Sequence, residues 1–251
     1  MNETLCRQLA LDYCCSPEEI LGGENVFTVF CPLEGRRRYQ EPKDCFLKAA
    51  VVNGKLLFTG KPEIVAWCRE RWRECGSEWF FEPETLRELD ARLRADGFQI
   101  GMAHPFFIAE TPSELCTDGV ELRWYRGGEI EAFRGNDSFS EAFGFCPEAP
   151  DMLGVAALED GRIVGMAGAS GDSPTMWQIG INVAPEARGR GVASLLVALM
   201  KNEILRQGVL PFYGTSMSHI ASQRAALAAG FRPAWAELVA EKINLPREEE
   251  K

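Results

Sequence analysis

The stretch MWQIGINVAPEARGRGVASLLVALMKNEILRQG, residues 176–208, combines a strand pattern, a basic glycine turn and a helix pattern. Ile179, Ile181 and Val183 alternate with Gly180 and Asn182, which predicts a half-buried strand. After the turn, apolar side chains recur at helical spacing, at Val192, Ala193, Leu195, Leu196, Leu199 and Met200. Glycine at 208 is typical of the position just after a helix end. We therefore expect a strand, a tight turn and a long helix.

The turn Arg188-Gly189-Arg190-Gly191 is suited to hold an anion. The first backbone N–H groups of a helix have no intrahelical acceptor, and the helix dipole adds positive potential there. Glycine lets the main chain approach a phosphate closely, because it has no Cβ. The alternative is a plain strand–turn–helix corner with solvated arginines. We expect a phosphate site, although neither G-x-x-x-x-G-K-[ST] nor G-x-G-x-x-G is present.

The same turn resembles motif A of the GNAT superfamily, the acyl-CoA-dependent N-acetyltransferases. The family pattern [Q/R]-x-x-G-x-[G/A] is filled by Arg188, Gly191 and Ala193. In that family the turn holds the pyrophosphate of coenzyme A. The resemblance covers about residues 118–245, where the expected element order also follows the family.

A second match lies in SHIASQRAALAAGF, residues 218–231. Ser222, Gly230 and Phe231 fit the family pattern at this point. His219 stands where the family commonly has Asn, and Ala226 stands where it has Tyr.

The resemblance implies an α/β (α+β, mixed-sheet) GNAT fold with splayed central strands. It also implies that main-chain groups around Ile181 to Val183 hold the pantetheine arm of acetyl-CoA and direct an N–H at the thioester oxygen. The implied cofactor-binding residues are Ile181, Asn182, Val183, Arg188, Gly189, Arg190, Gly191, Val192, Ala193, His219 and Ser222.

The proton-transfer residues are less well indicated. The strand from Met176 to Asn182 carries no carboxylate, so Asp172 and Glu141 are the candidate bases, unless water or an already neutral amine replaces them. Ala226 cannot donate a proton. The candidate acids are therefore Tyr213, His219 and Ser216, and the thiolate could also leave unprotonated.

The first half of the chain predicts a smaller α/β domain of unclear role at residues 1–115. Its strongest local signal is Asn53-Gly54, which predicts a type I′ hairpin turn. The segment Thr111–Gly119 is the expected linker, and residues 246–251 are expected to be a disordered tail. LALDYCCSPEEILGGENVF resembles the extra domain of some two-part bacterial GNAT proteins. Whether this part is a degenerate GNAT-like half or another α/β unit stays open.

Composition limits the other function classes. The net charge of −10 over 251 residues disfavours a general nucleic-acid binder. The nine cysteines are odd in number and include no C-x-x-C pair, which favours reduced thiols in the cytoplasm and no metal site. No apolar run is long enough for a membrane span, and the first residues do not resemble a signal peptide.

The sequence thus predicts a cytoplasmic enzyme that transfers an acetyl group from acetyl-CoA to a primary amine. The acceptor would be a small molecule or an amino terminus, and its identity cannot be read from the residues. The alternative is a non-catalytic acyl-CoA-binding module with a sensing or scaffolding role. A hydroxyl or protein-lysine acceptor and aminoacyl transfer are further variants, and the resemblance also allows a homodimer.

Overall fold

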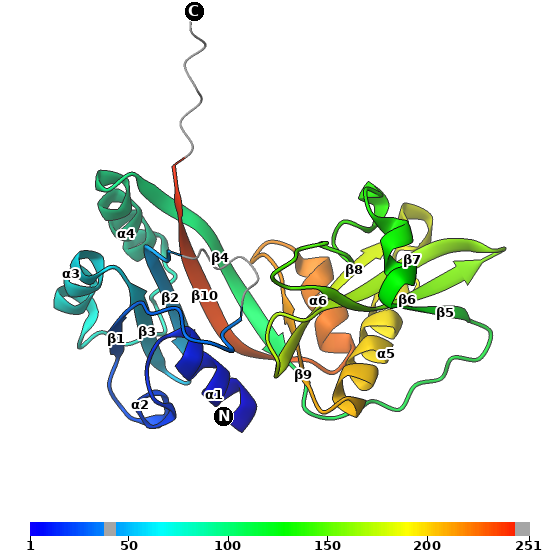
Figure 1. Ribbon diagram of the computed structural model, residues 1–251, viewed down its shortest axis with the longest axis horizontal. Helices are drawn as coiled ribbons and strands as arrows, with labels where there is room; N and C mark the ends of the chain where they lie inside the picture. Colours follow the sequence, from blue (N-terminus) through cyan, green and yellow to red (C-terminus); the bar gives the residue numbers. More distant parts are fainter. Residues whose placement is uncertain (38–43, 244–251) are drawn as a thin grey trace, which may run out of the picture. The chain divides into compact units, whose positions relative to one another are not determined.

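The computed structural model describes residues 1–37 and 44–243, and they form two compact units (Figure 1). The first, which we call the turn unit, contains residues 1–8, 34–37 and 105–234. The second, the hairpin unit, contains residues 9–33, 44–104 and 235–243. The expected tail at residues 246–251 lies outside the described residues. The domain boundaries 1–115 and 118–245 stay a prediction, because each unit takes residues from both ranges.

The hairpin unit is built on strands that pair in the order β1, β3, β2 and β10. Asn53 and Gly54 both have positive φ, of 50° and 78°, so the predicted type I′ turn is confirmed. The apolar core of this unit packs α3 and α4 against one face of its strands. The elements that lie in the unit wholly or in part are α1 (Glu3–Asp12), α2 (Pro17–Leu21), β1 (Val26–Val29), β2 (Leu47–Val52), β3 (Lys55–Gly60), α3 (Pro62–Trp72), α4 (Pro83–Ala95), β4 (Phe98–Ile108) and β10 (Arg232–Lys242).

The turn unit pairs the end of β4 with β9, and continues through β8, β7, β6 and β5. The β8–β9 pair is parallel and the others are antiparallel, so the sheet is mixed, as expected. The further elements of this unit are β5 (Glu121–Arg126), η1 (Gly127–Phe133), η2 (Asp137–Phe139), β6 (Asp151–Glu159), β7 (Arg162–Ser170), β8 (Met176–Val183), η3 (Pro185–Ala187), α5 (Val192–Arg206), β9 (Leu210–Gly214) and α6 (Ile220–Ala228). The α/β fold class with a mixed sheet is therefore confirmed.

The predicted strand, turn and helix are present as β8 and α5. Gly191 is the N-cap of α5 with a φ of 83°, and Gly208 follows its last turn with a φ of 77°. Both values lie in the left-handed region that favours glycine. Ile179 is buried, and Ile181 and Val183 pack against the same apolar core beneath α5, which confirms the predicted alternation of the strand.

The central strands of the turn unit splay apart. The pairing of β8 with β9 covers only Met176 to Gln178, opposite Leu210 to Phe212. Beyond Gln178, β8 stays paired with β7 as far as Val183. Within the described part of the chain, the other edge of β8 from Ile179 to Val183 therefore has no strand partner, and its main-chain groups are available for other contacts.

The linker region is held by polar side chains of α5. The amide of Asn202 accepts a hydrogen bond from the Ser113 N–H at 2.9 Å and donates one to the Ser113 carbonyl at 2.8 Å. The ammonium of Lys201, which is almost fully buried, donates to the Ser113 hydroxyl and to the Ala229 carbonyl at 2.9 Å. Burial lowers the pKa of Lys201. These contacts fix Ser113 beside α5 and the end of α6.

Three glycines form a row across β6, β7 and β8. Gly154 is paired with Gly168, and Gly168 with Gly180. A Cβ on Gly168 would lie 1.8 Å from the Ala142 carbonyl oxygen, and a Cβ on Gly180 would lie 1.7 Å from that of Glu141. The main chain of residues 141–142 thus lies directly on the sheet, at a distance that only glycine permits.

Side chains hold the two ends of this covering segment, residues 137–145. Asn182 accepts hydrogen bonds from the Glu141 and Ala142 N–H groups at 3.0 and 2.8 Å. Asp151 accepts from the Gly144 and Phe145 N–H groups at 3.2 and 2.8 Å. The short 3-10 helix η2 ends at Phe139, and one further turn follows, in which the Phe143 N–H donates to the Phe139 carbonyl at 3.0 Å.

Among the residues that the structure describes, no helix is long and apolar enough to cross a membrane.

Replacing either covered glycine is expected to destabilise the protein. Gly168→Ala and Gly180→Ala should each lower the free energy of unfolding by about 2 kcal/mol or more, because the added methyl group would overlap a carbonyl oxygen. Gly128→Ala is the matched control, since nothing lies within 4 Å of its Cβ position and its φ is not positive. Chemical denaturation measures all three variants, and equal stability of the three would contradict the close contact.

Candidate functional site

The N-terminus of α5 forms an open, glycine-lined corner at the end of β8. Gly189 and Gly191 have φ values of 75° and 83°, and nothing lies within 4 Å of the Cβ position of either residue. The amides of Val192, Ala193 and Ser194 have no intrahelical acceptor, and Gly191 has no side chain to cap them. The corner therefore offers hydrogen-bond donors and the positive end of a helix dipole to an anion.

The two arginines of the turn are held differently. The Arg188 side chain folds back toward the strand, and its Nε donates to the Val183 carbonyl at 3.3 Å. Arg190 forms a two-point ion pair with Glu159, with N–O distances of 3.1 and 2.5 Å, and this pairing raises the pKa of Arg190. Both partners are about half exposed, so the pair is weak enough to open for a competing anion.

The Asn182 side chain binds the segment that covers the glycine row. Its carbonyl oxygen is committed to the amides of Glu141 and Ala142. The main chain of Ile181 to Val183 remains on the unpaired edge of β8, so a role of its backbone groups in ligand binding stays a prediction.

Tyr213 and Ser222, two of the predicted site residues, are in contact. Their hydroxyl groups lie 2.8 Å apart, and the Tyr213 side chain is buried against the apolar core. Burial raises the pKa of Tyr213, hydrogen bonding to Ser222 opposes the rise, and the negative charge of Glu141 adds to it. Tyr213 therefore keeps its proton well above neutral pH.

The other candidate acids lie at the start of α6. His219 is exposed and is the N-cap residue of the helix, without a side-chain capping bond. The backbone N–H of His219 donates to the Ser216 carbonyl at 3.2 Å. The Ser216 hydroxyl lies 3.5 Å from the Ser218 hydroxyl. Ala226 is fully buried in the core beside α5, so no acidic group is available at the position where the family has Tyr.

The two candidate bases differ in environment. Asp172 is buried, and one of its carboxylate oxygens accepts a hydrogen bond from the Ser170 hydroxyl at 2.7 Å. Glu141 is exposed, and it stands on the segment that covers the glycine row. The negative charge of Glu141 contributes to the raised pKa of Tyr213.

The sequence did not predict two contacts, one made by the turn and one made by β8. Glu159 precedes Arg190 by 31 residues and meets it only because the β6–β7 hairpin brings its end to the turn. Asn182 meets residues 141–142 across 40 or 41 positions. The available signal for the second contact was the three glycines in neighbouring strands, whose absent side chains leave room for a covering chain.

The described residues contain no group of three or more His, Cys, Asp or Glu side chains that could hold a metal ion.

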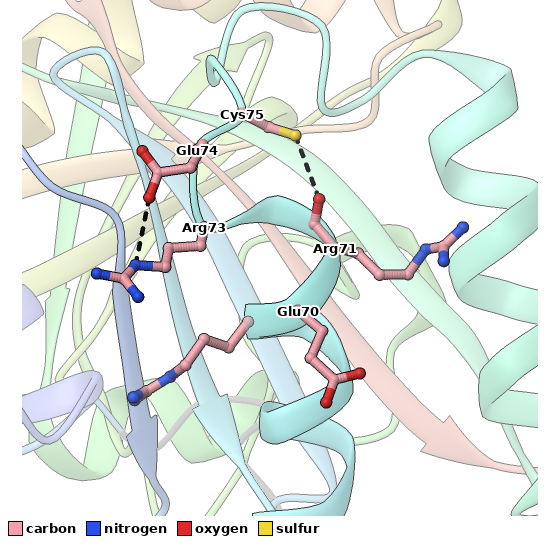
Figure 2. Close-up of a pocket in the computed structure, with 6 residues that line it drawn as sticks. Glu70, Arg71, Arg73, Glu74 and Cys75 are labelled. Carbon is pink, nitrogen blue, oxygen red and sulfur yellow. Dashed lines mark hydrogen bonds and ion pairs between the residues drawn. The ribbon is translucent and has the colours of Figure 1, made fainter.

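A surface pocket lies at the end of α3 in the hairpin unit (Figure 2). Its lining residues are Arg69, Glu70, Arg71, Arg73, Glu74 and Cys75. Figure 2 shows Arg71 and Arg73 extending in opposite directions, and Arg73 pairs with Glu74 at 3.3 Å. Because these charges do not converge on one point, the pocket is a weaker anion site than the corner at α5.

Comparison with known proteins identifies the family of the larger part of the turn unit. Residues 122–231 match the family model of the acetyltransferase (GNAT) family. No curated protein matches the chain. The family match shows that residues 122–231 form a GNAT-family domain, as the residues of the turn predicted, and acetyl transfer is the general chemistry of this family.

Three solved structures illustrate the likeness. A GNAT-family acetyltransferase from Novosphingobium aromaticivorans DSM 12444 is 19% identical, with 59% of this chain and 69% of that one covered and a TM-score of 0.45. A GCN5-related N-acetyltransferase-like protein from Streptococcus suis 89/1591 is 14% identical, with 95% and 98% covered and a TM-score of 0.49. The aminoglycoside N-acetyltransferase AAC(6')-Iy in complex with CoA is 24% identical, with 54% and 99% covered and a TM-score of 0.36.

Stability at alkaline pH should depend on Tyr213. Folding raises the pKa of Tyr213. The contribution of Tyr213 to the free energy of unfolding is therefore fully present below the ordinary tyrosine pKa of about 10, and it is lost as the pH rises through the pKa of the folded state. We expect the unfolding free energy of the wild type to fall above about pH 10, and that of Tyr213→Phe to fall less. Denaturation curves between pH 8 and pH 11, with Tyr125→Phe as control, measure the difference. Parallel curves for wild type and Tyr213→Phe would refute the assignment.

Proposed function

Because residues 122–231 form a GNAT-family domain, we propose that the protein transfers an acetyl group from acetyl-CoA to a primary amine. The acceptor would be a small molecule or the amino terminus of a substrate. The observation that carries the proposal is the open corner where α5 begins, at the end of the unpaired edge of β8. The corner can bind a phosphate, and the adjacent unpaired edge of β8 can form hydrogen bonds with an extended chain that contains amide groups.

The residues of the corner fit the pyrophosphate of coenzyme A. The positive φ and the free space at Gly189 and Gly191 admit a phosphate against the main chain. The amides of Val192 and Ala193 would donate to it, and Arg188 would add charge. Arg190 would contribute after exchanging Glu159 for phosphate oxygens. Backbone groups from Ile181 to Val183 would hold the pantetheine amides, and His219 and Ser222 would lie at the start of α6.

Acetyl-CoA supplies the activated acetyl thioester. The protein must position the amine, polarise the thioester carbonyl group, remove a proton from the amine and donate one to the departing sulfur. A main-chain N–H on the unpaired edge of β8 can donate to the thioester oxygen. Tyr213 is the candidate proton donor to the sulfur, because its pKa is raised by burial and it stays protonated at neutral pH. Glu141 is the candidate base for the amine, since its carboxylate is exposed and lies on the segment over the sheet.

A second candidate function is a non-catalytic acyl-CoA-binding module. Two observations favour it: Ala226 replaces the proton donor of the family, and the Tyr213 hydroxyl is already bonded to Ser222. Binding without turnover would distinguish this module from an enzyme. Residues 1–115 remain a proposed extra domain of the two-part bacterial type, without an assigned role. The cysteine pattern supports a cytoplasmic location.

Coenzyme A binding should depend on the glycine turn. Arg188→Ala combined with Gly191→Asp is expected to weaken acetyl-CoA binding at least about 100-fold, because one positive charge is lost and a negative charge faces the pyrophosphate. Isothermal titration calorimetry measures the dissociation constant. The matched control is Arg162→Ala with Gly119→Asp, since Gly119 has a similar φ of 77° and free space around its Cβ position. Absence of acetyl-CoA binding by the wild type would refute the proposal.

Replacing Tyr213 should lower the turnover rate without weakening acetyl-CoA binding. With a panel of primary amines, release of the free CoA thiol is expected for the wild type. Tyr213→Phe should lower kcat by about 10-fold or more, within the range of general acid catalysis, and change the dissociation constant of acetyl-CoA less than twofold. Ser222→Ala removes the hydrogen-bond partner of Tyr213 but leaves the Tyr213 hydroxyl, so it should lower kcat less than Tyr213→Phe does. Equal kcat in wild type and Tyr213→Phe would remove Tyr213 from the mechanism, and binding without turnover by any amine would favour the non-catalytic module.

A further inference from the structure

Two cysteines of the hairpin unit lie in direct contact, although the chain separates them by 17 residues. Cys14 follows α1 and Cys31 follows β1. The Cys14 Sγ lies 3.2 Å from the Cys31 backbone nitrogen, from which it accepts a hydrogen bond, and 3.1 Å from the Cys31 carbonyl oxygen, to which it donates one. The sulfur of one cysteine thus rests against the main chain of the other.

This contact places the Cys14 sulfur against the residue with which it would form a disulfide. A disulfide needs Cα atoms that are usually 4.4–6.8 Å apart and Cβ atoms that face each other. A thiol that touches both the N–H and the C=O group of Cys31 lies close to the Cα atom of Cys31, so the two side chains start from neighbouring positions. Cys31 is exposed and Cys14 is partly exposed, so a small oxidant can reach them.

The backbone around Cys14 is also specialised. Cys14 has a φ of 53°, a left-handed conformation that is uncommon for residues other than glycine. It is the left-handed residue of the cap that ends α1, and from this position the Cys14 thiol contacts Cys31. The surrounding structure holds it there through the main-chain bond from the Cys15 N–H to the Ala10 carbonyl, at 3.0 Å.

We propose that Cys14 and Cys31 form a reversible disulfide when the protein meets a low-molecular-weight disulfide such as oxidised glutathione. The thiolate of one cysteine attacks the glutathione disulfide, forming a mixed disulfide and releasing one glutathione thiolate. The thiolate of the other cysteine then attacks the protein sulfur of that mixed disulfide and releases the second glutathione. The two protein thiols lose two electrons and two protons in total, and one glutathione disulfide is reduced to two thiols.

The remaining described cysteines have other surroundings. Cys6, Cys45 and Cys68 are buried, and burial raises the pKa of Cys68 to about 12, which disfavours its reactive thiolate form. Cys75 and Cys116 are exposed, and their sulfur atoms contact the Arg71 carbonyl and the Asp118 carboxylate. Cys146 is partly exposed, and its sulfur atom contacts the Glu148 carboxylate. Cys15 is the neighbour that could compete with Cys14, and the experiment must separate these two.

The crosslink would restrain the segment between α1 and the end of β1. It would close a loop that contains α2 and β1, and thereby reduce the conformational freedom of the unfolded chain. The oxidised protein should therefore unfold at a Tm about 4 °C or more above that of the reduced protein. Because this inference concerns the hairpin unit and uses no acyl-CoA, it succeeds or fails independently of the proposed function.

Mass spectrometry of the full chain provides the direct test. The protein is equilibrated in glutathione buffers of stepped redox potential, the free thiols are alkylated, and the chain is digested. The sequence has no Lys or Arg between Arg7 and Arg36, so trypsin releases Cys14, Cys15 and Cys31 in one peptide, residues 8–36. A second cleavage after Glu18, Glu19 or Glu24 separates Cys31 from the other two.

The expected result is a crosslinked pair of peptides in the wild type and in Cys15→Ser, lighter by two hydrogens than the sum of the reduced peptides. Cys31→Ser and Cys14→Ser should lose both the crosslink and the rise in Tm on oxidation. Cys75→Ser is the control at an exposed cysteine and should behave as the wild type. Loss of the crosslink in Cys15→Ser, or glutathione adducts without a crosslink in oxidised wild type, would overturn the proposal.

Discussion

The turn unit depends on one close contact, in which the main chain of residues 141–142 lies on the glycine row of β7 and β8. The contact requires the absence of side chains at Gly168 and Gly180, since a Cβ at either position would overlap a carbonyl oxygen. It also explains why glycine stands in the middle of two strands, where it normally weakens pairing and leaves more freedom to the unfolded chain. The cost is offset by the hydrogen bonds from this segment to Asn182 and Asp151.

The same contact organises the residues around the unpaired part of β8. It places Glu141 over the strand that carries Ile181 and Val183, and it brings the Glu141 charge within influence of the buried Tyr213 hydroxyl. On the opposite face of the sheet, α5 packs closely, because Gly165 leaves room for Val192 and Leu196. The open corner at the start of α5 thus lies on one face of these strands, and the segment that carries Glu141 lies on the other face.

The local parts of this arrangement could be predicted from the sequence. The alternation in β8, the caps of α5 and the Asn53-Gly54 turn each depend on residues within one or two turns of the chain. The motif at Arg188 and Gly191 also identified the family. The partners of Arg190 and of the Asn182 side chain could not be predicted, because Glu159 and residues 141–142 become neighbours only through strand register. Likewise, the sequence around residues 139–143 does not reveal that the Glu141 and Ala142 N–H groups bond to Asn182, which lies about 40 positions away.

The docking of residues 141–142 through main-chain atoms has a consequence for how this domain can diversify. Carbonyl oxygens rest on the sheet whatever side chains the segment carries, and the Asn182 amide recognises N–H groups that every residue except proline provides. Exposed positions such as Glu141 can therefore be exchanged without loss of the anchorage. In an enzyme of this design, the surface above the central strand can acquire a new chemical preference by substitution in the segment alone, while the glycines beneath it stay constant.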